Sequence, residues 1–124
     1  MLILLVEDNE LNRDMLARRL ARRGFTVECA LDGESGIGMA RDRRPDVILM
    51  DIGLPGIDGW EAIRQLKSLP ETRGIPVITL TAHAFNEDRS RAETAGCAGF
   101  ISKPIDFQHL LDTIEQVKSS GSVK

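Results

Sequence analysis

Short apolar runs alternate with amphipathic stretches along the whole chain, and this rhythm predicts βαβ units that build a parallel sheet. Four predicted strands are apolar almost throughout, as in strands with both faces buried, and they cover residues 2–6, 46–50, 77–80 and 99–101. Residues 25–29 instead alternate apolar and polar side chains, which indicates a strand with one wet face or an edge position. The pattern therefore predicts an α/β fold.

The first two stretches between these strands are predicted to be helices. The first helix begins near Asn9, a favourable N-cap residue, and ends before Gly24. Its apolar residues share one side of the helix: Leu11, Met15, Leu16 and Leu20. The second helix covers residues 32–43, although it contains Gly36 and Gly38, each of which costs about 1 kcal/mol relative to alanine.

Three further helices complete the predicted alternation. The third follows a turn-rich loop at residues 53–59 and faces inward with Trp60, Ile63 and Leu66. The fourth, about residues 86–95, offers mostly alanines to the core, so it buries little apolar area and should be loosely held. The fifth has the clearest helical spacing, with apolar residues at positions 107, 110, 111, 114 and 117. Residues 119–124 are interpreted as a flexible C-terminal tail, which leaves residues 1–118 as the domain.

The composition is that of a globular protein with a single core. The chain has 124 residues, of which 42% are hydrophobic and 28% charged, and its net charge of −3 argues against a general affinity for nucleic acid. The N-terminal apolar run is too short for a signal peptide or a membrane span. Cys29 and Cys97 lack metal-ligand spacing, so they are interpreted as reduced residues of a cytoplasmic protein, with a disulfide between them as the alternative.

Polar residues suited to phosphoryl chemistry stand at the ends of the four apolar strands. Glu7 and Asp8 follow the first of them, Asp51 the second, Thr81 the third and Lys103 the fourth. In a parallel sheet these ends meet at the carboxyl edge, where open α/β folds bind their ligands. Three carboxylates, one hydroxyl and one ammonium group at one edge indicate a site for a divalent metal ion and a phosphoryl group.

Four segments at these strand ends carry a resemblance to a known family. Residues 6–9 read VEDN, residues 49–59 read LMDIGLPGIDG, residues 81–84 read TAHA and residues 103–104 read KP. In this order and spacing they resemble the receiver domain of two-component response regulators, over residues 2–117. The resemblance implies a flavodoxin-like (βα)5 fold, which is a three-layer sandwich around a five-stranded parallel sheet with the order 2-1-3-4-5.

The resemblance also implies a binding site for Mg²⁺ or Mn²⁺. Asp8 and Asp51 would provide carboxylate oxygens, Gly53 its backbone carbonyl, and Glu7 would assist through a water molecule. In the implied strand order Asp8 and Asp51 lie on chains about 5 Å apart, so their carboxylates repel each other unless a cation lies between them. The alternative is that Glu7 and Asp8 only stabilise the N-terminus of the first helix.

By the same resemblance, Asp51 would be the phosphoacceptor. Its carboxylate attacks the phosphorus of a phosphohistidine, carried by a sensor histidine kinase or a histidine phosphotransfer protein, and forms an aspartyl phosphate. Lys103 and the metal ion would neutralise charge on the transferring group. The alternatives are that Asp51 is a turn residue at a strand end and that Lys103 is a solvated lysine.

The resemblance assigns a switch to residues near the last two strands. The Thr81 hydroxyl would turn toward the phosphoryl oxygens, and Ala82 would leave room for this movement. Phe100 stands where many relatives have a tyrosine that moves inward when the threonine shifts, and the alternative is an ordinary core ring. The Lys103–Pro104 peptide bond is implied to be cis, although either isomer is possible. His83 is interpreted as a residue at the rim of the pocket.

A receiver of this kind is a signalling module rather than an enzyme with a separate substrate. Phosphorylation would change the partner affinity of the face formed by the fourth helix, the fifth strand and the fifth helix. The chain would then be a stand-alone receiver or part of a hybrid kinase. Five arginines make the outer side of the first helix basic, either as a solvated face or as a docking surface for a phosphodonor: Arg13, Arg18, Arg19, Arg22 and Arg23.

Three other functions fit the sequence less well. A Mg²⁺-dependent phosphatase with an aspartate nucleophile needs a second aspartate two residues later, where this chain has Gly53. A pseudo-receiver usually lacks the acceptor, the acidic pair or the lysine, and this chain has all of them. A flavin-binding protein of the same fold needs a phosphate-binding loop rich in Ser, Thr or Gly after the first strand, where this chain has Glu7, Asp8 and Asn9.

Overall fold

Strands and helices alternate along the chain in the computed structural model, which describes the backbone of residues 1–82 and 86–122 and the side chains of residues 1–82 and 88–118. The strands are β1 (Leu2–Val6), β2 (Thr26–Ala30), β3 (Val47–Asp51), β4 (Val77–Thr81) and β5 (Gly99–Ser102). The helices are α1 (Glu10–Arg22), α2 (Gly33–Arg43), α3 (Gly59–Ser68), α4 (Asn86–Thr94) and α5 (Phe107–Ser122). These bounds agree with the predicted elements to within a few residues, except at the C-terminus.

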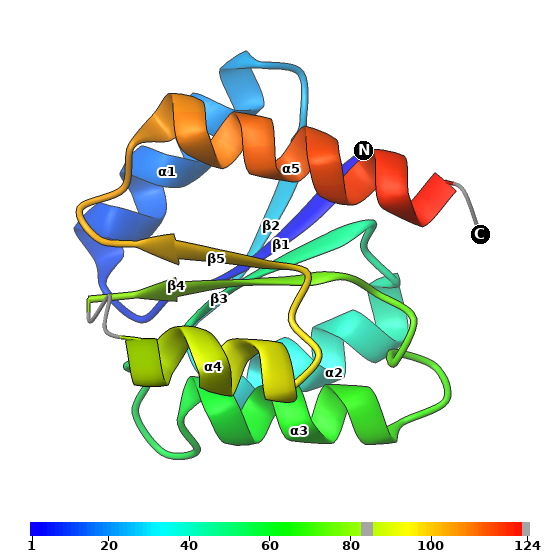
Figure 1. Ribbon diagram of the computed structural model, residues 1–124. Helices are drawn as coiled ribbons and strands as arrows, with labels where there is room; N and C mark the ends of the chain where they lie inside the picture. Colours follow the sequence, from blue (N-terminus) through cyan, green and yellow to red (C-terminus); the bar gives the residue numbers. More distant parts are fainter. Residues whose placement is uncertain (83–85, 123–124) are drawn as a thin grey trace.

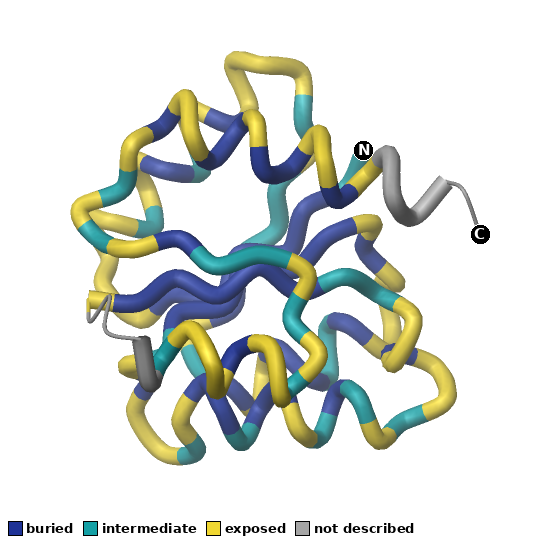
Figure 2. Tube along the Cα trace, in the orientation of Figure 1, coloured by how far each residue is buried: buried dark blue, intermediate teal, exposed yellow. Residues whose placement is uncertain are grey.

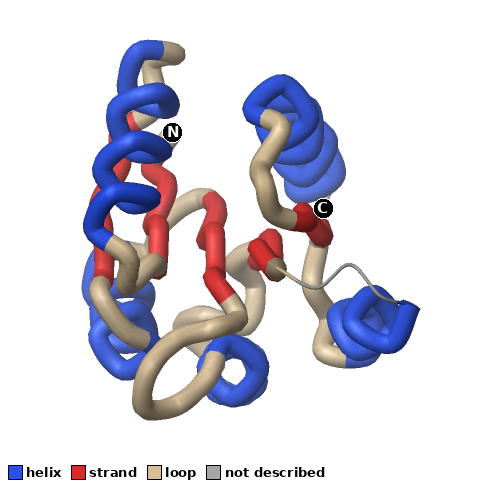
Figure 3. Tube along the Cα trace, turned by 90° about the vertical axis from the view of Figure 1, so that its left-hand side faces the viewer, coloured by secondary structure: helices blue, strands red, loops and turns tan. Residues whose placement is uncertain are grey.

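All strand pairs of the sheet are parallel, and the strand order is β2-β1-β3-β4-β5. The predicted order is confirmed, and β2 lies at an edge, as its alternating pattern indicated. Helices α1 and α5 cover one face of the sheet, and α2, α3 and α4 cover the other (Figure 1). The side view in Figure 3 shows helices on both sides of the strands. The flavodoxin-like three-layer fold is therefore confirmed.

Alternate residues of each central strand serve two separate apolar cores. In β1, Ile3 and Leu5 pack with residues of α1 and α5, whereas Leu4 and Val6 pack with residues of α2 and α3. Both sets are at most 2% exposed, and the central strands β1, β3 and β4 are the most continuously buried part of the chain (Figure 2). Burial on both faces explains why the central strands are apolar without alternation.

Helix α1 buries only part of its apolar side. Asn9 caps the helix as predicted, and its side chain accepts a hydrogen bond from the backbone N–H of Asn12 at 3.0 Å. Leu16 and Leu20 are buried, but Leu11 is 81% exposed and Met15 is 55% exposed. At 3.6 residues per turn, Leu11 and Met15 lie on a different side of the helix from Leu16 and Leu20. The prediction that these four residues share one side of the helix is therefore wrong, and only Leu16 and Leu20 face the core.

One of the two glycines of α2 has a packing role. A Cβ atom on Gly36 would lie 2.9 Å from Cγ2 of Val6, so the small residue lets α2 approach β1 closely. Gly38 has no heavy atom within 4 Å of the corresponding position. Glycine lowers the helix propensity at position 36, but the close contact between α2 and the sheet leaves no room for a larger residue.

The ends of the last two helices differ from the sequence prediction in one respect. Helix α4 has the predicted position, and among its described side chains only that of Ala92 is buried. Helix α5 continues to Ser122, so the prediction of a flexible tail from residue 119 is wrong for the backbone of residues 119–122. Within the residues that the structure describes, no helix has both the length and the apolar composition needed to cross a bilayer.

Candidate functional site

The carboxyl edge of the sheet brings together residues that are far apart in the sequence. Glu7 and Asp8 follow β1, Asp51 is the last residue of β3, and Thr81 is the last residue of β4. Lys103 follows β5 directly, and its backbone N–H donates to the carbonyl of Thr81 at 2.7 Å. The strand order places β1 and β3 side by side, so the acidic residues meet at the centre of the edge.

Glu7, Asp8 and Asp51 form an acidic cluster in which one ligand atom of each residue lies within 4.8 Å of the others. Glu7 is 2% exposed and Asp51 is 5% exposed, whereas Asp8 faces solvent. Carboxylate oxygens at this spacing match the ligand preference of a hard divalent cation such as Mg²⁺. The cluster is compatible with divalent metal binding, as the sequence predicted.

Lys103 is the counter-charge of the two buried carboxylates. Its Nζ lies 3.2 Å from Oε1 of Glu7 and 3.2 Å from Oδ1 of Asp51. Burial lowers the pKa of Lys103, but the attraction of Asp51 and Glu7 outweighs this effect and raises the pKa above its ordinary value. The ammonium group is therefore firmly charged at neutral pH. The Lys103–Pro104 peptide bond is cis, which confirms the expectation from the resemblance.

Glu7 contacts Lys103 directly, although no pattern in the sequence predicts this contact. Burial raises the pKa of the Glu7 carboxyl above its ordinary value, and a hydrogen bond shared with Asp51 raises it further. The Asn9 backbone N–H donates to Oε2 of Glu7 at 3.2 Å, and this bond acts in the opposite direction. Two carboxyl groups thus compete for one ammonium group, which makes the cluster receptive to a further cation.

The other predicted site residues lie around this cluster. The Gly53 backbone N–H donates to Oδ1 of Asp51 at 3.2 Å, and a Cβ atom at Gly53 would have open space around it, with no described heavy atom of another segment within 4 Å. Thr81 is buried and Ala82 is exposed. Phe100 is half-buried at the border of the core between the sheet and α2, α3 and α4. His83 lies outside the described residues.

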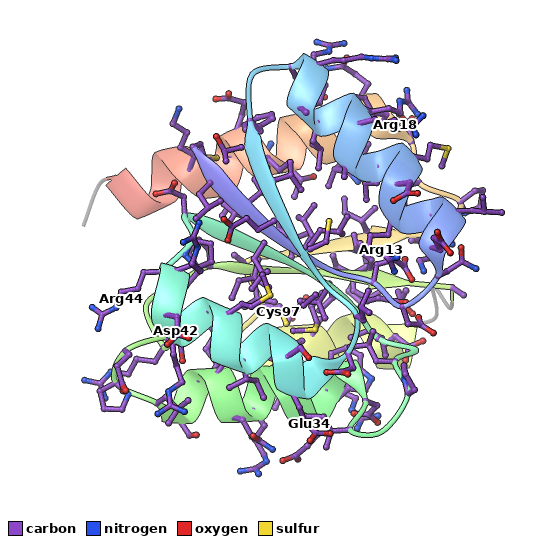
Figure 4. All side chains as sticks on the ribbon, turned by 180° about the vertical axis from the view of Figure 1, so that it is seen from behind. Arg13, Arg18, Glu34, Asp42, Arg44 and Cys97 are labelled. Carbon is purple, nitrogen blue, oxygen red and sulfur yellow. The ribbon has the colours of Figure 1, made fainter. Side chains whose placement is uncertain are left out.

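The arginines of α1 do not all belong to a solvated face. Arg13 turns back toward the end of β1, and its Nη1 donates to the carbonyls of Glu7 at 3.2 Å and Asp8 at 3.3 Å (Figure 4). The guanidinium of Arg19 lies over the Phe107 ring of α5, 4.2 Å from its centroid. At 3.6 residues per turn, Arg13 lies on the side of α1 that carries Leu16 and Leu20, so its assignment to the outer side is wrong. The long side chain of Arg19 reaches Phe107 from the border of that side. Arg18 and Arg22 remain exposed, as predicted.

The comparison with known proteins gives the same result in sequence and in structure. Residues 3–115 match the family model of the response regulator receiver domain. The chain is 40% identical, over 113 residues, to the polar-differentiation response regulator DivK of Brucella anthropi, and the match covers 91% of this chain and 92% of the relative.

Two solved structures show the same similarity. The chemotaxis response regulator CheY4 of Vibrio cholerae superimposes with a TM-score of 0.87 and 28% identity, covering 94% of this chain and 97% of the other. The signal receiver domain of a signal transduction histidine kinase from Syntrophus aciditrophicus gives a TM-score of 0.87 and 32% identity, covering 96% and 90%. With its strand order and its acidic cluster at the carboxyl edge, this chain belongs to the receiver domain family of two-component response regulators.

Proposed function

We propose that this protein is a phosphorelay receiver that accepts a phosphoryl group on Asp51. The observation that carries this proposal is the pairing of a buried carboxylate at the end of β3 with Lys103, beside two further carboxyl groups. Asp51 lies at the carboxyl edge, where a donor can approach, and its backbone is fixed in the sheet. The protein catalyses only its own phosphorylation and dephosphorylation and has no separate substrate.

Asp8 and Asp51 would hold Mg²⁺ or Mn²⁺ through carboxylate oxygens, with the Gly53 backbone carbonyl as a further ligand and Glu7 contributing through water. When bound, the ion supplies charge neutralisation for the phosphoryl oxygens. The mutual repulsion of the clustered carboxylates supports this assignment, because a divalent cation removes it.

The reaction forms one bond and breaks one. A carboxylate oxygen of Asp51 attacks the phosphorus of a phosphohistidine, and the P–N bond breaks with its electron pair leaving on the imidazole nitrogen. The Lys103 ammonium, which is paired with Asp51, is positioned to contact the phosphoryl oxygens as their charge develops. Gly53 places no side chain over Asp51, so water has access and the aspartyl phosphate is expected to be short-lived.

Thr81 and Phe100 would convert this chemistry into a conformational signal. Both side chains lie on the same face of the sheet, because Phe100 pairs in register with Thr79, two residues before Thr81. We infer that the Thr81 hydroxyl moves toward the phosphoryl oxygens, that Ala82 allows the movement, and that Phe100 then moves inward. The face of α4, β5 and α5 would change its affinity for a downstream protein as a result.

The proposed phosphodonor is a sensor histidine kinase or a histidine phosphotransfer protein, and the proposed location is the cytoplasm. A groove beside Lys103 supports docking of the donor at α1, since Met15 and Leu16 line it together with Ile105 and Phe107. The exposed arginines of α1 favour an acidic partner. Cys29 and Cys97 are both free thiols, which suits a reducing compartment.

The test of the proposed function is the intact mass of the wild-type protein after incubation with phosphoramidate. We expect one added phosphoryl group in the presence of Mg²⁺ and none when the metal is removed with EDTA, because the acidic cluster repels the donor without its cation. A protein that gains no phosphoryl group with Mg²⁺, and that also fails to bind beryllofluoride, would be a pseudo-receiver.

Asp8→Asn is expected to remove most of the stabilisation that Mg²⁺ gives the folded protein. An ion at ten times its dissociation constant stabilises the wild type by about 1.4 kcal/mol, because it binds the folded state only. The variant loses one charged ligand, but without metal it should be at least as stable as the wild type, because repulsion with Glu7 and Asp51 is relieved.

Thermal melting with and without Mg²⁺ measures both effects of Asp8→Asn. Asp14→Asn is the matched control, since Asp14 is an exposed aspartate of α1 outside the acidic cluster. If Asp8→Asn gains as much melting temperature from Mg²⁺ as the control does, Asp8 is not a metal ligand. If Asp8→Asn melts at a lower temperature than the wild type without metal, repulsion among the clustered carboxylates does not destabilise the metal-free protein.

A further inference from the structure

Helix α4 meets the rest of the domain through two arginine–aromatic contacts. The guanidinium carbon of Arg89 lies 4.9 Å from the centroid of the Phe100 ring on β5. The guanidinium carbon of Arg91 lies 4.9 Å from the centroid of the Trp60 ring on α3. Since Ala92 is the only buried residue among the α4 side chains that the structure describes, these cation–π contacts add to a small apolar contact in positioning the helix.

The two contacts have different relations to the phosphorylation site. Phe100 lies on the strand next to β4 and on the same face of the sheet as Thr81. Trp60 belongs to α3 and packs in the core between that helix and the sheet, so Arg91 joins one helix to another. Of these two contacts, it is the Arg89 contact that joins α4 to the strand pair β4–β5, which ends at Thr81 and Ser102.

Phe100 has no hydroxyl group, so no hydrogen bond at the ring tip can fix its orientation. A guanidinium over the ring face can do so, because the face of an aromatic ring carries partial negative charge and attracts a planar cation. Arg89 is exposed and Phe100 is half-buried, so the contact holds the ring at the border of the core. If the Phe100 ring moves inward, it loses its contact with the Arg89 guanidinium.

We propose that Arg89 is a positioning residue that holds Phe100 at the border of the core and thereby opposes the switch to the phosphorylated conformation. This inference rests on the proposed function, because it concerns the regulation of the same site. The free energy needed to break the contact between Arg89 and Phe100 reduces the net free energy of binding a phosphoryl group at Asp51. Removal of Arg89 should therefore tighten binding at the site, although Arg89 touches none of the acidic residues.

The experiment measures the affinity of the folded chain for beryllofluoride in the presence of Mg²⁺ by isothermal titration calorimetry. We expect Arg89→Gln to bind about two- to five-fold more tightly than the wild type, which is the factor carried by a cation–π contact of an exposed pair. Arg91→Gln is the matched control, because it removes the same charge and the same kind of contact from the same helix. Its affinity should equal that of the wild type.

A double-mutant cycle identifies the ring through which Arg89 acts. In a Phe100→Leu background, Arg89→Gln should leave the affinity unchanged, because the cation has no ring to hold. Arg89→Lys keeps the charge but not the planar group, so its affinity should fall between those of the wild type and Arg89→Gln. A merely structural role of Arg89 would weaken binding instead, since a loosened α4 disturbs the site.

The outcomes separate this inference from the proposed function. The inference is overturned if Arg89→Gln binds no more tightly than the wild type, if Arg91→Gln gains as much, or if the gain persists without the Phe100 ring. In each of these cases the wild type still binds beryllofluoride, and the proposed function stands. If the wild type itself does not bind beryllofluoride, the proposed function fails and the inference falls with it.

Discussion

Replacement of Asp51 by asparagine is expected to abolish phosphorylation by phosphoramidate completely. The neutral amide is a poor nucleophile, and it also removes the negative charge that Lys103 neutralises at 3.2 Å. The fold should survive, because Lys103 keeps its ion pair with Glu7 and the β3 backbone is unchanged. Intact mass after incubation with Mg²⁺ and phosphoramidate measures the loss directly.

The control for this prediction is Asp42→Asn, which makes the same chemical change at an exposed position of α2. We expect this variant to gain one phosphoryl group, like the wild type. Full labelling of Asp51→Asn would exclude Asp51 as the acceptor. Melting temperatures of the two variants within a few degrees of each other would show that the loss of labelling is not a loss of folding.

Gly59→Ala is expected to destabilise the protein by about 3 kcal/mol, the upper range for forcing extra atoms into a packed site. A Cβ atom at this position would lie 2.5 Å from the carbonyl oxygen of Asp51 and 2.6 Å from Cα of Ile52. Both atoms belong to the backbone and cannot turn away as a side chain does. The Gly59 N–H also donates to the Ile52 carbonyl at 3.0 Å, so α3 begins in direct contact with the end of β3.

Urea denaturation of Gly59→Ala and Gly38→Ala provides the comparison. Gly38 is helical and has open space at the Cβ position, so its replacement should stabilise the protein by about 0.5–1 kcal/mol. The two glycines thus predict shifts of opposite sign from the same substitution. Equal stability of Gly59→Ala and the wild type would mean that α3 moves away from β3 at little cost.

Periodicity was sufficient to predict the alternation of strands and helices because both faces of the sheet are covered, whereas the strand order came from the family resemblance. Central strands with no polar face are apolar throughout, and the one alternating strand, Thr26–Ala30, lies at the edge. The prediction failed at Leu11 and Met15, which are exposed. At 3.6 residues per turn these two residues lie on a different side of α1 from Leu16 and Leu20, so apolar character alone did not show which side faces the core.

The members of the candidate site were predictable, and their contacts were not. Glu7, Asp8, Asp51 and Lys103 each follow an apolar strand, and parallel topology brings strand ends together. The sequence contains no local signal that Lys103 binds Glu7 as well as Asp51. The contacts of the α4 arginines with aromatic rings could not be predicted from the sequence either. A solvated arginine and an arginine that lies over an aromatic ring occur in the same kind of polar helical segment.

The ion pair between Lys103 and Glu7 has a consequence for biosynthesis, since it joins residues 96 positions apart. At ribosomal rates of about 5–20 residues per second, Lys103 is synthesised roughly 5–20 seconds after Glu7. A nascent or truncated chain that lacks the last strand carries the acceptor carboxylate and its acidic neighbours without this counter-charge. Competence to receive a phosphoryl group is therefore expected only once the chain includes Lys103, and shorter products should not accept phosphoryl groups from the kinase.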